Sequence, residues 1–174
     1  YYEASRIMKF RGETVIHIHV SYLPTPSHIG EPKSKPTQLS VKTLNSMGIQ
    51  PDFIVARSEV NMDSRRRERF SLFCSVQPEN IIDNPDLENV YELPLVFAKQ
   101  EFDIKILKML GLKTQKINLS NWTNLIEKFQ KRKETKKTIV IVGKYFATGD
   151  YELKDSYAAL LDALDHAQTY LEKK

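Results

Sequence analysis

Short segments rich in apolar and β-branched residues alternate with helix-length segments along the first half of the chain. Residues 14–23 alternate apolar and polar positions and predict a strand, and residues 52–58 form a short apolar run that predicts a buried strand. A third, very short strand is expected to end at Asn84 and Pro85. Because strands that alternate with helices form parallel sheets, this pattern predicts an α/β fold.

Helices are expected between and after these strands. Thr37 or Ser40 is expected to cap the first of them, and Gly48 suits the position just after its end. Asp63 or Ser64 is expected to cap the next helix. Further helices are expected over 1–11, over 87–110 with a break near Pro94, and over 121–132, where Trp122, Leu125, Ile126 and Phe129 share one face.

The loop that follows the first predicted strand, GEPKSKPTQLS at 30–40, has the chemistry of an anion site. Lys33 and Lys35 supply two ammonium groups, which suit phosphate oxygens as point charges. Pro32 and Pro36 fix φ and reduce the entropy that the loop loses when it becomes ordered. Ligands of parallel sheets bind at the carboxyl ends of the strands, where this loop lies. An ordinary solvated basic loop remains the alternative.

Three neutral residues of this loop complete the candidate site. Ser34, Thr37 and Gln38 add hydrogen-bonding groups beside the lysines, and the N-terminus of the following helix adds its dipole. The sequence contains neither G-x-x-x-x-G-K-[ST] nor G-x-G-x-x-G, and no pair of carboxylates is obviously placed for magnesium. No catalytic residue and no metal ligand is therefore assigned to this chain.

Other reactive residue types have a structural interpretation. His17 and His19 have a spacing that can bind zinc, but a structural zinc site needs four ligands and no second cluster lies nearby, so histidines of the core or its surroundings are preferred. Cys74 lies in an apolar stretch with no base partner and is expected to be a buried thiol. The basic run of Arg65, Arg66, Arg67 and Arg69 is expected to form a solvated helix face, with one arginine turned toward a ligand as the alternative.

Composition limits the class of protein. The chain has 174 residues, of which 41% are hydrophobic and 28% charged, with a net charge of +4 and one cysteine. These values fit a globular protein of a reducing compartment, and we expect a cytoplasmic location. No signal peptide and no apolar run of about 18 residues occur, so no membrane is expected as a partner. The mild charge argues against a nucleic acid partner and suits small anions.

The composition changes near residue 131. The charge run KRKETKK at 131–137 is expected to be a helix end or linker, followed by an apolar strand, KTIVIVGKYF at 137–146, and a helix over 155–171. One strand and one helix cannot bury both faces of a sheet, so we expect 138–174 to be the beginning of a further domain.

The stretch KSKPTQLSVKTLNSMGIQPDFIVARS closely resembles the cytidine triphosphate (CTP) synthase family. That family carries K-[ST]-K-P-T-Q followed by S-V-x-x-L-x-x-x-G-I-x-P-D, and the similarity continues through FSLFCSV, NVYELPL and VGKY…DSY, so it covers essentially the whole chain. The resemblance implies a P-loop-like, doubly wound parallel sheet, present here as an incomplete synthetase domain. It also implies the first strand and helix of a class I glutaminase domain, with a synthetase part at 1–118, a helical linker at 119–137 and a truncated glutaminase part at 138–174.

The resemblance further implies ATP-dependent amination of UTP to CTP, in a protein that is typically a homotetramer. ATP phosphorylates the uracil 4-oxygen, and ammonia released from glutamine displaces the phosphate; Mg²⁺ takes part, and its ligands are expected mostly outside this chain. The chain alone is expected to be inactive. Ala158 stands where some members have a lysine linked to the activator GTP, so a response to GTP is in doubt.

Site residues are carried over from the family motif by position. The residues that match its segment for UTP and for the feedback inhibitor CTP are Lys33, Ser34, Lys35, Pro36, Thr37 and Gln38, together with Arg69. Arg69 departs from the lysine usual in the family, which keeps the charge but changes its geometry. Arg57, Asp86 and Leu87 match positions near ATP. Two alternatives stay open: a non-catalytic pyrimidine-nucleotide-binding or regulatory module, and an interaction remnant that packs against a complete synthase.

Overall fold

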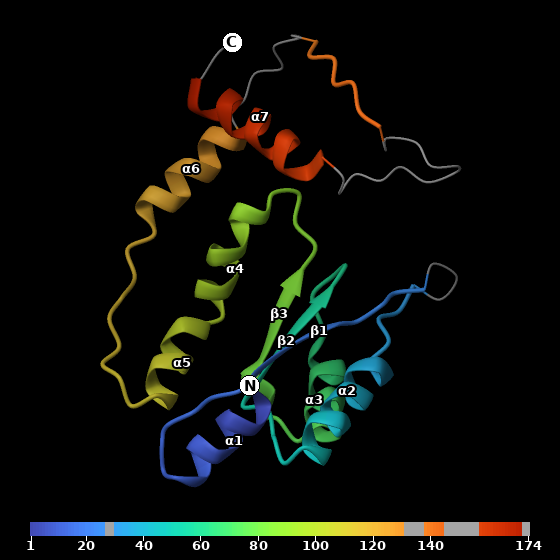
Figure 1. Ribbon diagram of the computed structural model, residues 1–174, viewed down its shortest axis with the longest axis vertical. Helices are drawn as coiled ribbons and strands as arrows, with labels where there is room; N and C mark the ends of the chain where they lie inside the picture. Colours follow the sequence, from blue (N-terminus) through green and yellow to red (C-terminus); the bar gives the residue numbers. More distant parts are fainter. Residues whose placement is uncertain (27–29, 131–137, 145–156, 172–174) are drawn as a thin grey trace. The chain divides into compact units, whose positions relative to one another are not determined.

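The computed structural model describes residues 1–26, 30–130, 138–144 and 157–171 (Figure 1). The chain divides into two compact units, Tyr1–Ile117 and Asn118–Lys174. The first unit contains α1 (Tyr2–Phe10), β1 (Ile18–Tyr22), α2 (Lys35–Ser46), β2 (Phe53–Ser58), α3 (Ser64–Cys74), η1 (Pro78–Asn80), β3 (Ile81–Pro85), η2 (Val90–Glu92), α4 (Leu93–Lys99) and α5 (Phe102–Met109). The second unit contains α6 (Ser120–Gln130) and α7 (Ala158–Leu171).

The first unit is built on a parallel sheet, which confirms the predicted α/β class. Its strand order is β1-β2-β3, and both strand pairs are parallel. Each crossover between neighbouring strands passes through one α-helix, α2 or α3, and the second crossover also contains η1. All three strands therefore end at the same edge of the sheet.

Helices cover both faces of this sheet, with α2 and α3 on one side and α4 and α5 on the other (Figure 1). Alternate residues of β2 supply the two cores. Ile54 and Ala56 pack with Val41 of α2 and Phe70 of α3. On the opposite face the core consists of Phe53, Val55, Ile82 and Phe102, with Phe97 and Ile106 packed against them. The two-residue period of the buried strand thus separates one core from the other.

Strand β1 begins later than the sequence pattern indicates. Its first residue is Ile18, because the backbone N–H of His17 donates to the side chain of Asp52, and the His17 carbonyl accepts from the N–H groups of Asp52 and Phe53. This local linkage replaces strand pairing before position 18.

The two faces of β1 differ in chemistry. Ser21 and His19 face α2, where they hydrogen bond to hydroxyls of that helix. Ile18, Val20 and Tyr22 share the other face with Phe53, the register partner of Ile18, and their residues are 40%, 65% and 51% exposed. The apolar half of the predicted alternation therefore faces solvent in this unit.

One predicted helix cap is confirmed and one predicted helix break is corrected by the structure. Asp63, one of the two residues expected to cap α3, is the observed cap, since its carboxylate accepts from the N–H of Arg66. Pro94 lies in the first turn of α4 and does not break a helix, because its missing N–H has no intrahelical partner to lose there. The break comes at Glu101, which adopts a left-handed conformation with φ of 54° between α4 and α5.

The second unit confirms the amphipathic helix of the sequence analysis. Ile126 of α6 is buried, and Trp122, Leu125 and Phe129 on the same face are half-buried. The strand predicted over 137–146 does not form in its described part, 138–144. A strand needs a neighbour for its N–H and C=O groups, and the described part of this unit contains no second strand.

Parts of the sequence analysis fall on residues outside the described ranges. These are the charge run at 131–137 and the last two residues of the strand predicted over 137–146, together with the start of the helix predicted from 155. Helix α7 is described from Ala158. No helix among the described residues is both long enough and apolar enough to cross a membrane.

Candidate functional site

A pocket lies at the carboxyl ends of β1 and β2, between the start of α2 and the face of α3. Leu23, Met62 and Phe70 form apolar parts of its wall, and Ser34, Arg66 and Arg69 are among its polar residues. The empty volume of the pocket, which includes the part open to solvent, is about 500 Å³. This position agrees with the rule that parallel sheets bind ligands beyond the carboxyl ends of their strands.

The basic loop enters α2 earlier than expected. Ser34 precedes the first helical residue, so the predicted caps at Thr37 and Ser40 are wrong, and the last four residues of the K-S-K-P-T-Q motif are helical. Pro36 explains the early start, because its fixed φ suits the first turn and it needs no hydrogen-bond donor there. Gly48 follows the helix with φ of +75°, as predicted.

Buried polar contacts fasten the start of α2 to the sheet. Thr37 has 0% exposure, and its hydroxyl lies 2.6 Å from the hydroxyl of Ser21 on β1. The Ser40 hydroxyl donates to the Thr37 carbonyl, so the nearby His19 Nε2, 2.8 Å away, donates to Ser40. Thr37 therefore fixes the motif to β1, and its buried side chain does not line the pocket.

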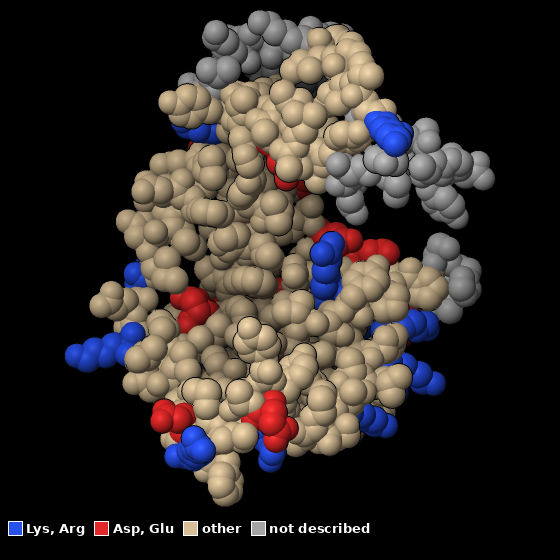
Figure 2. Space-filling view, in the orientation of Figure 1, with Lys and Arg blue, Asp and Glu red and all other residues tan. Residues whose placement is uncertain are grey.

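The other motif residues lie around the pocket or on the surface next to it. The N–H of Lys33 donates to the carbonyl of Pro24, which ties the loop to the end of β1. The Gln38 amide donates to the Ser34 hydroxyl at 2.9 Å, so these two side chains form one polar group. Lys35 and Pro36 are exposed. Figure 2 shows several Lys and Arg side chains on the surface over α2 and α3.

The arginines of α3 do not form one solvated face. Arg66 and Arg69 line the pocket, while the guanidinium of Arg67 turns inward and donates to the Ile81 carbonyl and the Asp83 carboxylate. The expected solvated face is therefore wrong for Arg67, whose partner is Asp83 of β3. The alternative, an arginine turned toward a ligand, stays a prediction for Arg66 and Arg69.

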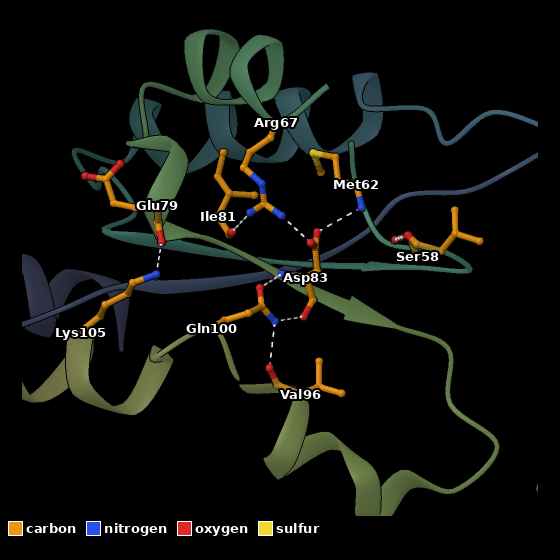
Figure 3. Close-up of polar contacts among 10 residues, drawn as sticks. Ser58, Met62, Arg67, Glu79, Ile81, Asp83, Val96, Gln100 and Lys105 are labelled. Atoms are coloured by element: carbon orange, nitrogen blue, oxygen red, sulfur yellow. Dashed lines mark hydrogen bonds and ion pairs between the residues drawn. The ribbon is translucent and has the colours of Figure 1, made fainter. Parts of the chain in front are cut away.

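Asp83 is the centre of a polar network that fixes α3 to β3 (Figure 3). Its carboxylate also accepts from the N–H of Met62 at 3.3 Å, and its backbone N–H and C=O both bond to the side-chain amide of Gln100 at 2.8 and 2.9 Å. Since Met62 and two arginines of α3 line the pocket, this network determines where the basic wall of the pocket lies.

The residues predicted near ATP form a separate group at the same edge of the sheet. Arg57 Nη2 lies 3.6 Å from Asp86 Oδ1, and the Asp86 N–H donates to the carbonyl of Ser58. Side chains alternate along β2, so Arg57 lies on the face opposite Ser58, which lines the pocket. Leu87, the residue after Asp86, is half-buried. The structure thus brings Arg57 and Asp86 together and separates them from Ser34 and Arg69.

The histidines and the cysteine have structural partners. His17 Nε2 lies 3.0 Å from the hydroxyl of Ser5, and burial lowers the pKa of His19 below its ordinary value of 6.5. Burial raises the pKa of Cys74 to about 11, which makes it a poor nucleophile. No group of three or more His, Cys, Asp or Glu side chains in the described ranges could hold a metal ion.

Sequence reasoning missed Glu31 and Arg66 as residues of the pocket. Glu31 joins Lys33 and Arg66, with oxygen–nitrogen distances of 3.8 and 3.5 Å. An acidic residue two positions before a motif lysine was a visible signal. Its partner on α3 could be identified only from the tertiary structure.

Comparison with known proteins gives a consistent result. The family model described as "CTP synthase N-terminus" matches residues 1–112. The chain is 40% identical to CTP synthase of Caldanaerobacter subterraneus subsp. tengcongensis, over 91% of the chain and 28% of that protein. It is 43% identical to CTP synthase of Bdellovibrio bacteriovorus, over 88% of the chain and 28% of that protein. It is 40% identical to CTP synthase of Pyrococcus abyssi, over 99% of the chain and 31% of that protein. The chain spans about three tenths of these relatives, and it belongs to the CTP synthase family.

Proposed function

We propose that this chain provides the pyrimidine-nucleotide triphosphate site of an enzyme that converts UTP to CTP with ATP and glutamine-derived ammonia. The observation that carries the proposal is the pocket at the ends of β1 and β2, which brings Ser34 of the motif to Arg66 and Arg69 of α3. Arginine is well suited to phosphate because its planar group donates two parallel hydrogen bonds. The names of the relatives support the reaction.

Each motif residue has a role that follows from its position. Lys33 and Lys35 neutralise the triphosphate as point charges, and Arg69 replaces a third ammonium with a planar guanidinium. The linked hydroxyl and amide of Ser34 and Gln38 hydrogen bond to the same nucleotide. Thr37 positions them by fixing the first turn of α2 to the sheet.

The reaction needs ATP to phosphorylate the uracil 4-oxygen before ammonia displaces the phosphate. We place ATP next to Arg57, Asp86 and Leu87, on the opposite side of β2 from the pocket. The described residues offer no cluster of metal ligands, so they do not fit the Mg²⁺ that accompanies ATP, and we assign no step to it here.

We further propose that residues 1–118 form the C-terminal part of a P-loop-like synthetase domain, 119–137 a linker, and 138–174 the start of a class I glutaminase domain. The helices on both faces of the parallel sheet support the first of these assignments. We place the parent enzyme, a homotetramer, in the cytoplasm. With Ala158 in place of a lysine, we expect no strong activation by GTP.

The proposal is tested by calorimetric titration of the chain with UTP and CTP. Lys35→Ala should weaken binding about 10- to 150-fold, because a hydrogen bond to a charged group contributes about 1.5–3 kcal/mol. Lys42→Ala, a matched change of an exposed lysine on the same helix, should have no effect. Equal affinities for wild type and Lys35→Ala would refute the role of Lys35 in nucleotide binding.

A second function, a non-catalytic pyrimidine-nucleotide module, is favoured for the isolated chain by the absence of a phosphate loop from its sequence. We expect the 174-residue chain to bind UTP but to form no CTP from UTP, ATP and ammonium. CTP detected by chromatography in that mixture would reject this proposal for the isolated chain.

A further inference from the structure

The pocket contains its own carboxylate. Glu31 Oε2 lies 3.8 Å from Lys33 Nζ, and Glu31 Oε1 lies 3.5 Å from Arg66 Nη2. Both partners are cations at the site where a phosphate chain is proposed to bind. Among the described residues that line the pocket, Glu31 is the acidic one, and Arg66 and Arg69 are the basic ones.

We propose that Glu31 is a built-in competitor for phosphate, which must be displaced from Lys33 and Arg66 before a polyphosphate binds there. A carboxylate offers two oxygens to these cations, as a phosphate group would, so both cannot occupy the same donors. The inference rests on the proposed function and deepens it, because it identifies a residue that sets the affinity of the site for anions.

The Glu31 carboxylate can move away from Arg66 and Lys33 while both residues keep other contacts that hold them in place. Arg66 keeps a second carboxylate, since Asp63 Oδ2 lies 3.1 Å from its Nη1 and Asp63 also caps α3. Lys33 keeps its backbone bond to Pro24 while its side chain turns. The Glu31 side chain is 49% exposed, so water can solvate the released carboxylate.

Exposed ion pairs are weak, which makes such a contact suitable for release. Each such pair changes an equilibrium constant by a factor of only about 1.4 to 5. Removing two of them by Glu31→Gln is therefore expected to tighten phosphate binding roughly two- to thirtyfold. A carboxylate that served only to position the loop would act in the opposite direction, since its loss would weaken binding.

The experiment is a calorimetric titration of the 174-residue chain with inorganic tripolyphosphate. Wild type, Glu31→Gln and Glu68→Gln are compared at one salt concentration. Glu68 is an exposed carboxylate on α3 that does not line the pocket, so its variant makes the same charge change outside the site. We expect tighter binding in Glu31→Gln and little change in Glu68→Gln. Equal gains in both variants would mean general electrostatics and would overturn the proposal.

A double-mutant cycle adds a test of the specific contact. In a Lys33→Met background, the gain from Glu31→Gln should shrink, because one of the two cations that Glu31 holds is gone. An undiminished gain, weaker binding in Glu31→Gln, or no binding of tripolyphosphate to any variant would each reject the competitor role. Tripolyphosphate lacks a base, so its titration tests the role of Glu31 alone. A failure of the proposed pyrimidine-nucleotide site would show instead in the titrations with UTP and CTP.

Discussion

The ion pair of Arg67 and Asp83 gives the sharpest prediction about how the pocket is held. Their side chains are 24% and 11% exposed, so both charges are largely removed from water. Replacing Asp83 by Ala leaves the Arg67 guanidinium without its counter-ion and also removes the acceptor of the Met62 N–H. Breaking a buried pair in this way costs about 3–5 kcal/mol.

That loss is large for a unit of this size. Total stabilities are about 5–15 kcal/mol, and urea m-values for small domains are about 1–3 kcal/mol/M. A loss of 3 kcal/mol therefore lowers the urea midpoint of Asp83→Ala by at least about 1 M. The assay is equilibrium urea unfolding followed by circular dichroism, with the m-value fitted for each variant.

A double variant distinguishes the cost of an unpaired buried charge from the cost of lost packing. Arg67→Met removes the stranded guanidinium but keeps much of the aliphatic stem, so Asp83→Ala with Arg67→Met should be more stable than Asp83→Ala alone. If Asp83→Ala costs less than about 1 kcal/mol, or if the two changes simply add, the pair does not fix α3 as we argue.

Two further predictions use the pKa shifts. Burial lowers the pKa of His19 in the folded chain, so below about pH 6.5 the unfolded chain binds a proton that the folded chain does not. The free energy of unfolding should therefore fall as the pH drops below about 6.5, and His19 contributes at most about 1.4 kcal/mol per pH unit to that fall. Urea unfolding at several pH values should show a smaller drop for His19→Gln, and an identical drop would exclude His19 as a source. With a pKa of about 11, the Cys74 thiol should react with a disulfide reagent at pH 8 only as the chain unfolds. Rapid labelling without urea would contradict its burial.

Local patterns predicted most elements of the first unit. The buried run at 52–58 and the parallel arrangement followed from apolar content and from the alternation of strands and helices. Boundaries were missed where a particular contact decides them. The Asp52 side chain delays the start of β1, and the rigid ring of Pro36 lets α2 begin before Thr37.

Tertiary partners could not be read from the sequence. A run of basic residues gives no sign that Arg67 pairs with Asp83, since the two lie 16 positions apart on different elements. The apolar pattern of 137–146 predicted a strand, yet the described residues 138–144 form none and have no described strand to pair with in their unit. The pocket itself depends on how α2 and α3 are placed at the ends of the strands.

The central claim is that the pocket formed by Ser34, Arg66 and Arg69 binds a pyrimidine nucleoside triphosphate. It is tested most directly by titrating the ¹⁵N-labelled chain with CTP and mapping amide chemical-shift changes. We predict that the largest changes fall on the loop of residues 30–34, on the start of α2 and on the pocket face of α3, and that tripolyphosphate reproduces only part of them. Changes confined to other surfaces, or no saturable change with CTP, would contradict the account.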